Sequence, residues 1–110
     1  MIVRMTHKAR EKVKLDDKSL TSIQKETSFL DEWYVNIFTL NYKKYFILTE
    51  AKSLFSIVID SKGINSIASF EIMLFESVNK EIGKINKKHE KDEGEIIEYC
   101  KTENKGVLGS

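Results

Sequence analysis

The spacing of hydrophobic residues changes once along the chain, and this change predicts the order of its main elements. Residues 33–40 alternate between two faces and are rich in aromatic and β-branched side chains, which is typical of a β-strand. Two further short apolar runs follow at 45–49 and 54–59, each separated from its neighbour by polar turn residues. Because such short connections join antiparallel strands, the three runs predict an antiparallel meander.

From residue 65 to about residue 84, apolar positions recur every three or four residues instead. This spacing predicts an amphipathic helix whose apolar stripe packs against one face of the sheet. Asn65 or Ser66 is suited to cap its start, and Gly83 to weaken or end it. The stripe consists of Ile67, Phe70, Leu74, Val78 and Ile82.

The two ends of the chain add shorter elements to this centre. Residues 2–5 predict a strand, and Thr6 is suited to cap a helix over 7–15. Residues 95–101 predict a last strand, while the polar stretches 16–27 and 86–94 predict loops. We therefore expect one α+β domain over residues 1–110. It would consist of an antiparallel sheet of four to five strands with one main amphipathic helix packed on one face.

The composition indicates the cellular compartment and the type of genome more clearly than the function of the protein. The 18 basic and 17 acidic side chains leave a net charge of +1, without the basic excess of a dedicated nucleic-acid binder. Cys100 is the single cysteine, which suits a reducing compartment. No secretory signal and no apolar run near the roughly 20 residues that span a bilayer occur, so we expect a cytoplasmic protein without a membrane partner. The lack of proline and the abundance of Lys, Ile, Glu and Asn favour an AT-rich bacterial, phage or plasmid genome.

Residues with catalytic potential are few and scattered. His7 and His89 have no second obvious metal ligand nearby, so we expect no metal. Cys100 lies in a predicted strand, where a buried structural thiol is the favoured interpretation. The sequence contains no nucleophile elbow, phosphate-binding glycine loop or dinucleotide fingerprint. We therefore expect no cofactor and assign no catalytic residue, and we favour a non-enzymatic protein over an enzyme.

Aromatic residues near lysines form a candidate binding surface: Trp33, Tyr34 and Tyr42. Exposed aromatic rings beside Lys43 and Lys44 would suit stacking on single-stranded nucleic acid. The strand alternation, in contrast, favours Trp33 as a core residue. A protein partner docking on an open face of the sheet is equally compatible with these rings.

Three stretches of the chain carry a family resemblance. They are the opening Arg4-Met5-Thr6-His7-Lys8, the tryptophan strand within 31–36, and the terminal Lys-Thr-Glu-Asn-Lys-Gly-Val-Leu-Gly-Ser of 101–110. Together they resemble an uncharacterised bacterial and phage-borne family, a domain of unknown function. Methionine replaces a cysteine of that family at Met5, and Lys105-Gly106 replaces an Arg-Ser pair. The resemblance implies no activity.

The resemblance does imply a candidate binding surface of recurring polar residues. If the first and last strands pair, these residues would gather at one end of the sheet. Capping by Thr6 and a turn at 104–106 are the alternative explanation for several of them. The set is Arg4, Thr6, Lys8, Asn36, Thr102, Asn104 and Lys105.

We consider three functions. The first is a small non-enzymatic binding or regulatory protein that acts on a macromolecular partner, in a phage or plasmid setting an inhibitor of a host defence system. The second is a small nucleic-acid-directed toxin or nuclease that uses Arg4, Lys8, Asn104 and Lys105. The third is a nucleic-acid-binding module without catalysis. Another protein is the favoured partner and nucleic acid is the alternative. A homodimer through the outer face of the sheet or through an unpaired edge strand is also compatible with the predicted sheet.

Overall fold

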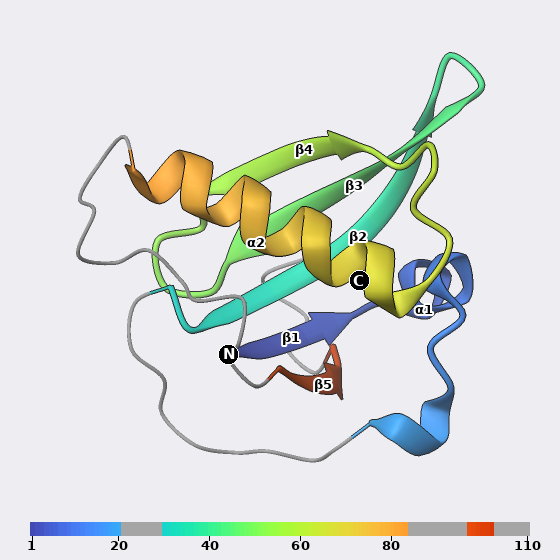
Figure 1. The fold of residues 1–110 in the computed structure, drawn as a ribbon, viewed down its shortest axis with the longest axis horizontal. Helices are drawn as coiled ribbons and strands as arrows, with labels where there is room; N and C mark the ends of the chain where they lie inside the picture. Colours follow the sequence, from blue (N-terminus) through green and yellow to red (C-terminus); the bar gives the residue numbers. More distant parts are fainter. Residues whose placement is uncertain (21–29, 84–96, 103–110) are drawn as a thin grey trace.

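The computed structural model describes residues 1–20, 30–83 and 97–102, and Figure 1 shows their arrangement. One five-stranded sheet forms the centre, α2 crosses one of its faces, and α1 lies near one end (Figure 1). The elements in chain order are β1 (Ile2–Met5), α1 (His7–Val13), a 3₁₀ turn η1 (Asp17–Ser19), β2 (Glu32–Leu40), β3 (Lys43–Glu50), β4 (Ser56–Asp60), α2 (Ile67–Gly83) and β5 (Glu98–Lys101).

The sheet is mixed, with strand order β4-β3-β2-β1-β5. β2, β3 and β4 form the antiparallel meander that the alternating pattern predicts. β1, however, runs parallel to both β2 and β5, so the prediction of a purely antiparallel sheet is wrong. The reason is the length of the connections. β1 is joined to β2 through α1 and η1, and β4 is joined to β5 through α2. Connections of this length allow the chain to cross over and form parallel pairs.

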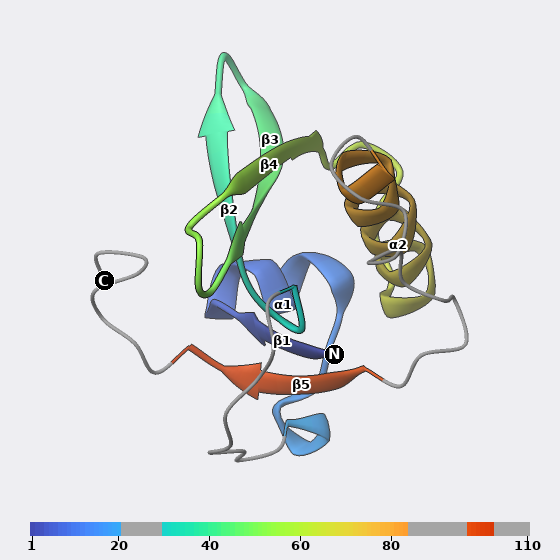
Figure 2. The same ribbon diagram turned by 90° about the vertical axis from the view of Figure 1, so that its left-hand side faces the viewer.

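The hydrophobic core is formed by side chains of the sheet and of both helices, and Figure 2 shows the sheet and α2 from the side. We call the sheet face under α2 the helix face and the opposite one the far face. Phe70, Leu74 and Val78 of the predicted stripe are fully buried, while Ile67 packs at the edge of the core. The main side chains that the sheet contributes to the helix face are Val3, Met5, Trp33, Val35, Phe46 and Leu48.

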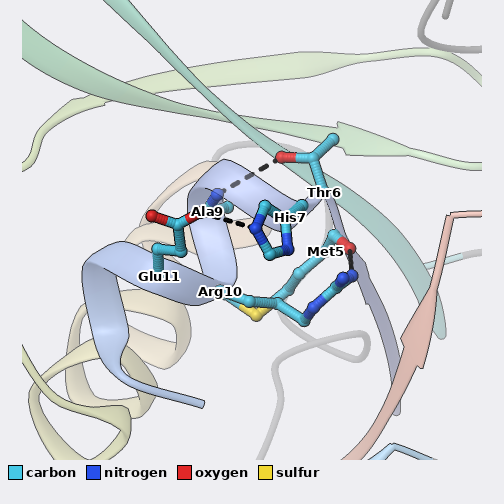
Figure 3. Close-up of polar contacts among 6 residues, drawn as sticks. All are labelled: Met5, Thr6, His7, Ala9, Arg10 and Glu11. Atoms are coloured by element: carbon cyan, nitrogen blue, oxygen red, sulfur yellow. Dashed lines mark hydrogen bonds and ion pairs between the residues drawn. The ribbon is translucent and has the colours of Figure 1, made fainter. Parts of the chain in front are cut away.

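The start of α1 follows from local side-chain chemistry (Figure 3). Thr6 has extended backbone, and its hydroxyl accepts a hydrogen bond from the Ala9 amide at 3.4 Å, which confirms it as the N-cap. The buried Arg10 donates from Nη1 to the Met5 carbonyl at 2.7 Å, tying α1 to the end of β1. The helix ends two residues earlier than predicted, because Lys14 adopts the left-handed conformation at φ 59°.

α2 is fixed at its start and in its middle. The Ser66 hydroxyl accepts from the Ser69 amide and the Ser69 hydroxyl accepts from the Ser66 amide, both at 3.2 Å, so Ser66 is the cap. Tyr99 of β5 donates its hydroxyl to Glu71 at 2.6 Å, and burial together with this hydrogen bond raises the pKa of the tyrosine. α2 is described up to Gly83. Neither described helix has the length and apolar character of a membrane span.

Candidate functional site

The β2–β3 hairpin extends away from the body of the molecule (Figures 1 and 2). Its turn consists of Asn41 and Tyr42, with φ of 51° and 66°, the two positive values of a type I′ turn. The Tyr42 side chain is fully exposed, at 103% of its reference area. Asparagine tolerates such a backbone, whereas a tyrosine there is unusual, since a side chain with a Cβ is disfavoured at positive φ.

A cleft of about 470 Å³ lies between the hairpin and α1. We call it the α1–hairpin cleft. It forms because α1 follows β1 directly and therefore lies beside the neighbouring strand β2, where the hairpin begins. The residues that line it are Lys8, Glu11 and Lys12 of α1, Ile37, Phe38 and Thr39 of β2, and Lys44 of β3.

The cleft combines positive charge with an apolar wall. Three lysines and one glutamate line it, a local excess of two positive charges in a chain whose net charge is +1. Lys12 donates to the Asn65 side chain at 2.5 Å, which links α1 to the segment before α2. Lys8 and Lys44 are exposed, and the fixed position of α1 holds Lys8 across from the hairpin. Such a cleft suits an anionic group that carries an apolar part.

Exposed apolar side chains also lie along the hairpin, and those of Phe38, Leu40 and Tyr45 share the face opposite to that of Thr39 and Lys44. Phe38 is 37% exposed and stacks on Tyr45 with ring centroids 5.6 Å apart. Leu40, the last residue of β2, is 56% exposed. We call Phe38, Leu40, Tyr42 and Tyr45 the hairpin patch. None of these side chains belongs to the hydrophobic core between sheet and helices.

Four polar residues that the family resemblance singles out lie on the far face of the sheet or next to it. Arg4 donates from Nε to Glu32 at 2.6 Å, in an ion pair whose side chains are 8% and 15% exposed. The Thr6 hydroxyl donates to Asn36 Oδ1 at 3.0 Å. Thr102 follows β5 and is half-buried. β1 and β5 do pair, so these residues lie at neighbouring positions of the register.

The remaining candidates divide between the cleft, the core and the undescribed part of the chain. Lys8 lines the cleft, and Tyr42 is exposed at the hairpin turn. Trp33 and Tyr34 are 1% and 5% exposed, so they offer no aromatic surface. Trp33 instead donates its indole N–H to the Leu30 carbonyl at 3.0 Å. Asn104 and Lys105 lie outside the described residues.

The electrostatics around Arg4 indicate a structural pair. Burial opposes the charge of the guanidinium, but the hydrogen bond and attraction to Glu32 outweigh it and raise the pKa of Arg4. Cys100, its register partner on β5, is buried at 1% exposure, as the structural interpretation of this thiol predicts. Within residues 1–20, 30–83 and 97–102, no three His, Cys, Asp or Glu side chains are grouped to hold a metal.

Sequence reasoning missed several residues of the cleft and one buried charge. Lys12, Lys44 and Phe38 meet only because α1 lies beside the hairpin, and no local pattern encodes that placement. Glu50 is fully buried at the end of β3, where its carboxylate accepts backbone N–H groups of the following turn. An acidic residue just before a polar turn was the available signal for that role.

The fold defines the class of this protein as an α+β domain built on a five-stranded mixed sheet. Within this class, residues 2–110 match a protein family described as a domain of unknown function, DUF6933. The chain belongs to this family, so the resemblance to a domain of unknown function is confirmed. No curated protein and no solved structure matches the chain.

Proposed function

We propose that this protein acts by binding another protein, through the hairpin patch and the α1–hairpin cleft. It is a non-enzymatic module whose effect comes from occupying its partner. The observation that carries the proposal is the conformation of Tyr42, which combines full exposure with a positive φ of 66°. A backbone of this kind favours glycine, so the tyrosine lowers the stability of the hairpin by about 1 kcal/mol.

Binding explains why a tyrosine occupies that position. An exposed ring at the end of a hairpin adds nothing to the core, so stability does not account for it. Tyrosine is, in contrast, enriched among the residues that dominate the energy of protein interfaces, since it presents a large rigid surface with a polar end. Leu54 shares the positive φ, so what distinguishes Tyr42 is that the unfavourable conformation presents a fully exposed aromatic ring.

The charges of the cleft indicate the chemistry of the partner. Lys8 and Lys44 line the cleft together with the apolar residues Ile37 and Phe38 of β2. A matching surface carries aspartate or glutamate side chains next to an apolar residue that enters the cleft. Such complementarity increases the association rate and excludes basic partners. We therefore infer an acidic protein surface as the partner.

Affinity purification of the tagged protein from a bacterial lysate, with and without nuclease, tests this function. The wild type should retain one stoichiometric protein that survives nuclease, and the double variant Lys8→Glu with Lys44→Glu should lose it. Glutamate is favourable in the first turn of a helix, so the change at Lys8 is compatible with a stable α1. Capture of the same protein by the double variant would contradict the proposal.

A matched control for the charge reversal is available at the other end of β3. Lys52 is exposed in the turn between β3 and β4 and does not line the cleft. Lys52→Glu changes the net charge in the same direction and should leave capture unchanged. Loss of capture in this control would mean that overall charge, rather than the cleft, attracts the partner.

A second candidate function is supported by the same turn. Tyr42 is followed by the exposed lysines Lys43 and Lys44, an arrangement that suits stacking on single-stranded nucleic acid. Recovery of nucleic acid alone, removed by nuclease and weakened steeply by salt, would favour this function.

The identity of a captured protein also tests the narrower hypothesis that the partner belongs to a host defence system.

A further inference from the structure

The outer edge of β4 is the second unusual surface of the molecule. β4 ends the strand order, so within the described part of the chain no strand pairs with its outer side. Its pairing with β3 is continuous from Ser56 to Asp60 and contains no bulge. Val58, at the centre of the strand, is 54% exposed. Among the described residues, β4 is therefore a regular strand with one edge open.

The hydrogen bonds to β3 show which backbone groups face outward. The Glu50 amide donates to the Phe55 carbonyl at 2.8 Å, and the Ser61 amide donates to the Lys44 carbonyl at 3.0 Å. In an antiparallel pair, inward-facing residues alternate with outward-facing ones. Residues 57 and 59 therefore face β3, and the N–H and C=O groups of Ser56, Val58 and Asp60 point away from it.

The two edges of the sheet differ in how they discourage pairing. Proteins commonly protect an open edge with charged residues, proline or a bulge. β5, at the other edge, carries Glu98 and Lys101 in a strand of four residues. From Ser53 to Ile59 the chain has no charged residue, and two exposed apolar side chains, Leu54 and Phe55, precede β4. The charge of β4 is confined to Asp60 at its end, so the edge from Ser56 to Ile59 lacks the usual protection.

We propose that the β4 edge binds the β4 edge of a second copy of this chain, in an antiparallel dimer with a two-fold axis at Val58. In this register all of β4 is paired, and Val58 meets Val58 of the second copy on the far face. Ile57 meets Ile59 of the second copy on the helix face. Cross-strand pairs of β-branched residues are favourable, and a two-fold interface of this kind closes on itself.

Charge favours this register over its neighbours. The axis at Val58 places Asp60 opposite the uncharged Ser56 of the second copy. A register with the axis at Asp60 would set two aspartates against each other, which is unfavourable. A register with the axis at Ser56 leaves Asp60 outside the pairing. The sequence of β4 is therefore complementary to itself in one arrangement, which pairs the two open edges with each other.

Sedimentation over a wide concentration range tests the dimer with two different variants of the full chain. Val58→Lys adds a charge at the axis, and Val58→Pro removes the outward N–H without removing a hydrogen bond to β3. Both variants should sediment as monomers while the wild type approaches twice the mass of one chain. Ile72→Lys is the matched control: Ile72 is 59% exposed on α2, so this variant should stay dimeric.

Three outcomes of the sedimentation experiment would overturn the proposal. They are a wild type that stays monomeric at every concentration, a dimer that persists in both Val58 variants, or a dimer that is lost equally in Ile72→Lys. Hydrogen exchange gives an independent readout that does not depend on either variant folding well. The amides of Val58 and Asp60 should become protected as wild-type concentration rises, and unchanged protection would contradict the paired edge. The variants do not alter the cleft, so the two proposals fail separately.

Discussion

At the scale of single residues, two exposed residues share a left-handed backbone and a similar effect on stability, but we assign a binding role to only one of them. Tyr42 and Leu54 have φ of 66° and 62°, and both side chains are exposed. Both therefore lower the stability of the fold by a similar amount relative to glycine. They lie at opposite ends of β3, and only Tyr42 belongs to the hairpin patch. This makes Leu54 the natural reference for any experiment on Tyr42.

Glu50 shows the opposite case, a buried charge that stabilises the fold. Its Oε1 accepts from the amides of Lys52 at 3.1 Å and Ser53 at 2.7 Å, and its Oε2 accepts from the Leu30 amide at 3.2 Å. Burial alone would raise the pKa of this carboxyl, but the backbone donors outweigh it and lower the pKa. The carboxylate therefore joins the β3–β4 turn to the segment before β2 in its charged form.

Replacing Glu50 by glutamine should lower the free energy of unfolding by about 2 kcal/mol at neutral pH, because an amide NH₂ cannot accept the Leu30 N–H. The folded pKa is lowered, so the stabilisation is complete above the ordinary glutamate pKa and is lost as the pH falls towards the folded value. The difference between wild type and Glu50→Gln should therefore shrink below about pH 4. Urea unfolding at several pH values measures it.

The control for this experiment is Glu76→Gln, because Glu76 is exposed on α2. This variant should unfold like the wild type at every pH. A difference between wild type and Glu50→Gln that does not change with pH would contradict the role assigned to the charged carboxylate. So would a Glu50→Gln variant that is as stable as the wild type.

At the scale of elements, the sequence predicts best what depends on local periodicity. The meander and α2 follow from alternation and from a three-to-four-residue stripe, and both are confirmed. The boundaries at the hairpin differ, because a four-residue polar turn was expected at 41–44. Asn41 and Tyr42 alone make the turn, so Lys43 and Lys44 lie in β3. Because tyrosine is not a typical turn residue, no sequence signal placed a two-residue turn at Asn41 and Tyr42.

The start of α1 depends on Thr6 in two ways. Its hydroxyl caps the helix at the Ala9 amide and donates to Asn36, which in turn accepts from the Ile37 amide at 2.8 Å. Thr6→Ala should lower the free energy of unfolding by about 1–2 kcal/mol, since both hydrogen bonds are lost. Thr6→Ser keeps the hydroxyl and should cost far less. Chemical denaturation compares the two variants, and equal stability of Thr6→Ala and wild type would remove the structural role.

At the scale of the whole molecule, strand direction and the candidate site depend on long-range placement. The parallel pairing of β1 has no signature in local sequence, because alternation is the same in either direction. Lys8 and Tyr42 were predicted as binding residues from motif and composition. Their neighbours Lys12 and Phe38 were not, because α1 meets the hairpin only in the folded chain. The hairpin and the β4 edge then provide two separate surfaces on one small sheet.

The most direct test of the proposed binding function compares Tyr42→Gly with Leu54→Gly in unfolding and in capture from a bacterial lysate. Relief of the left-handed backbone should make each variant more stable than the wild type by about 0.5–1 kcal/mol, after allowing for the greater freedom of glycine in the unfolded chain. Leu54→Gly should retain the nuclease-resistant partner. Tyr42→Gly should lose this partner although the variant is more stable than the wild type. A Tyr42→Gly variant that captures the same partner as fully as the wild type would contradict the account.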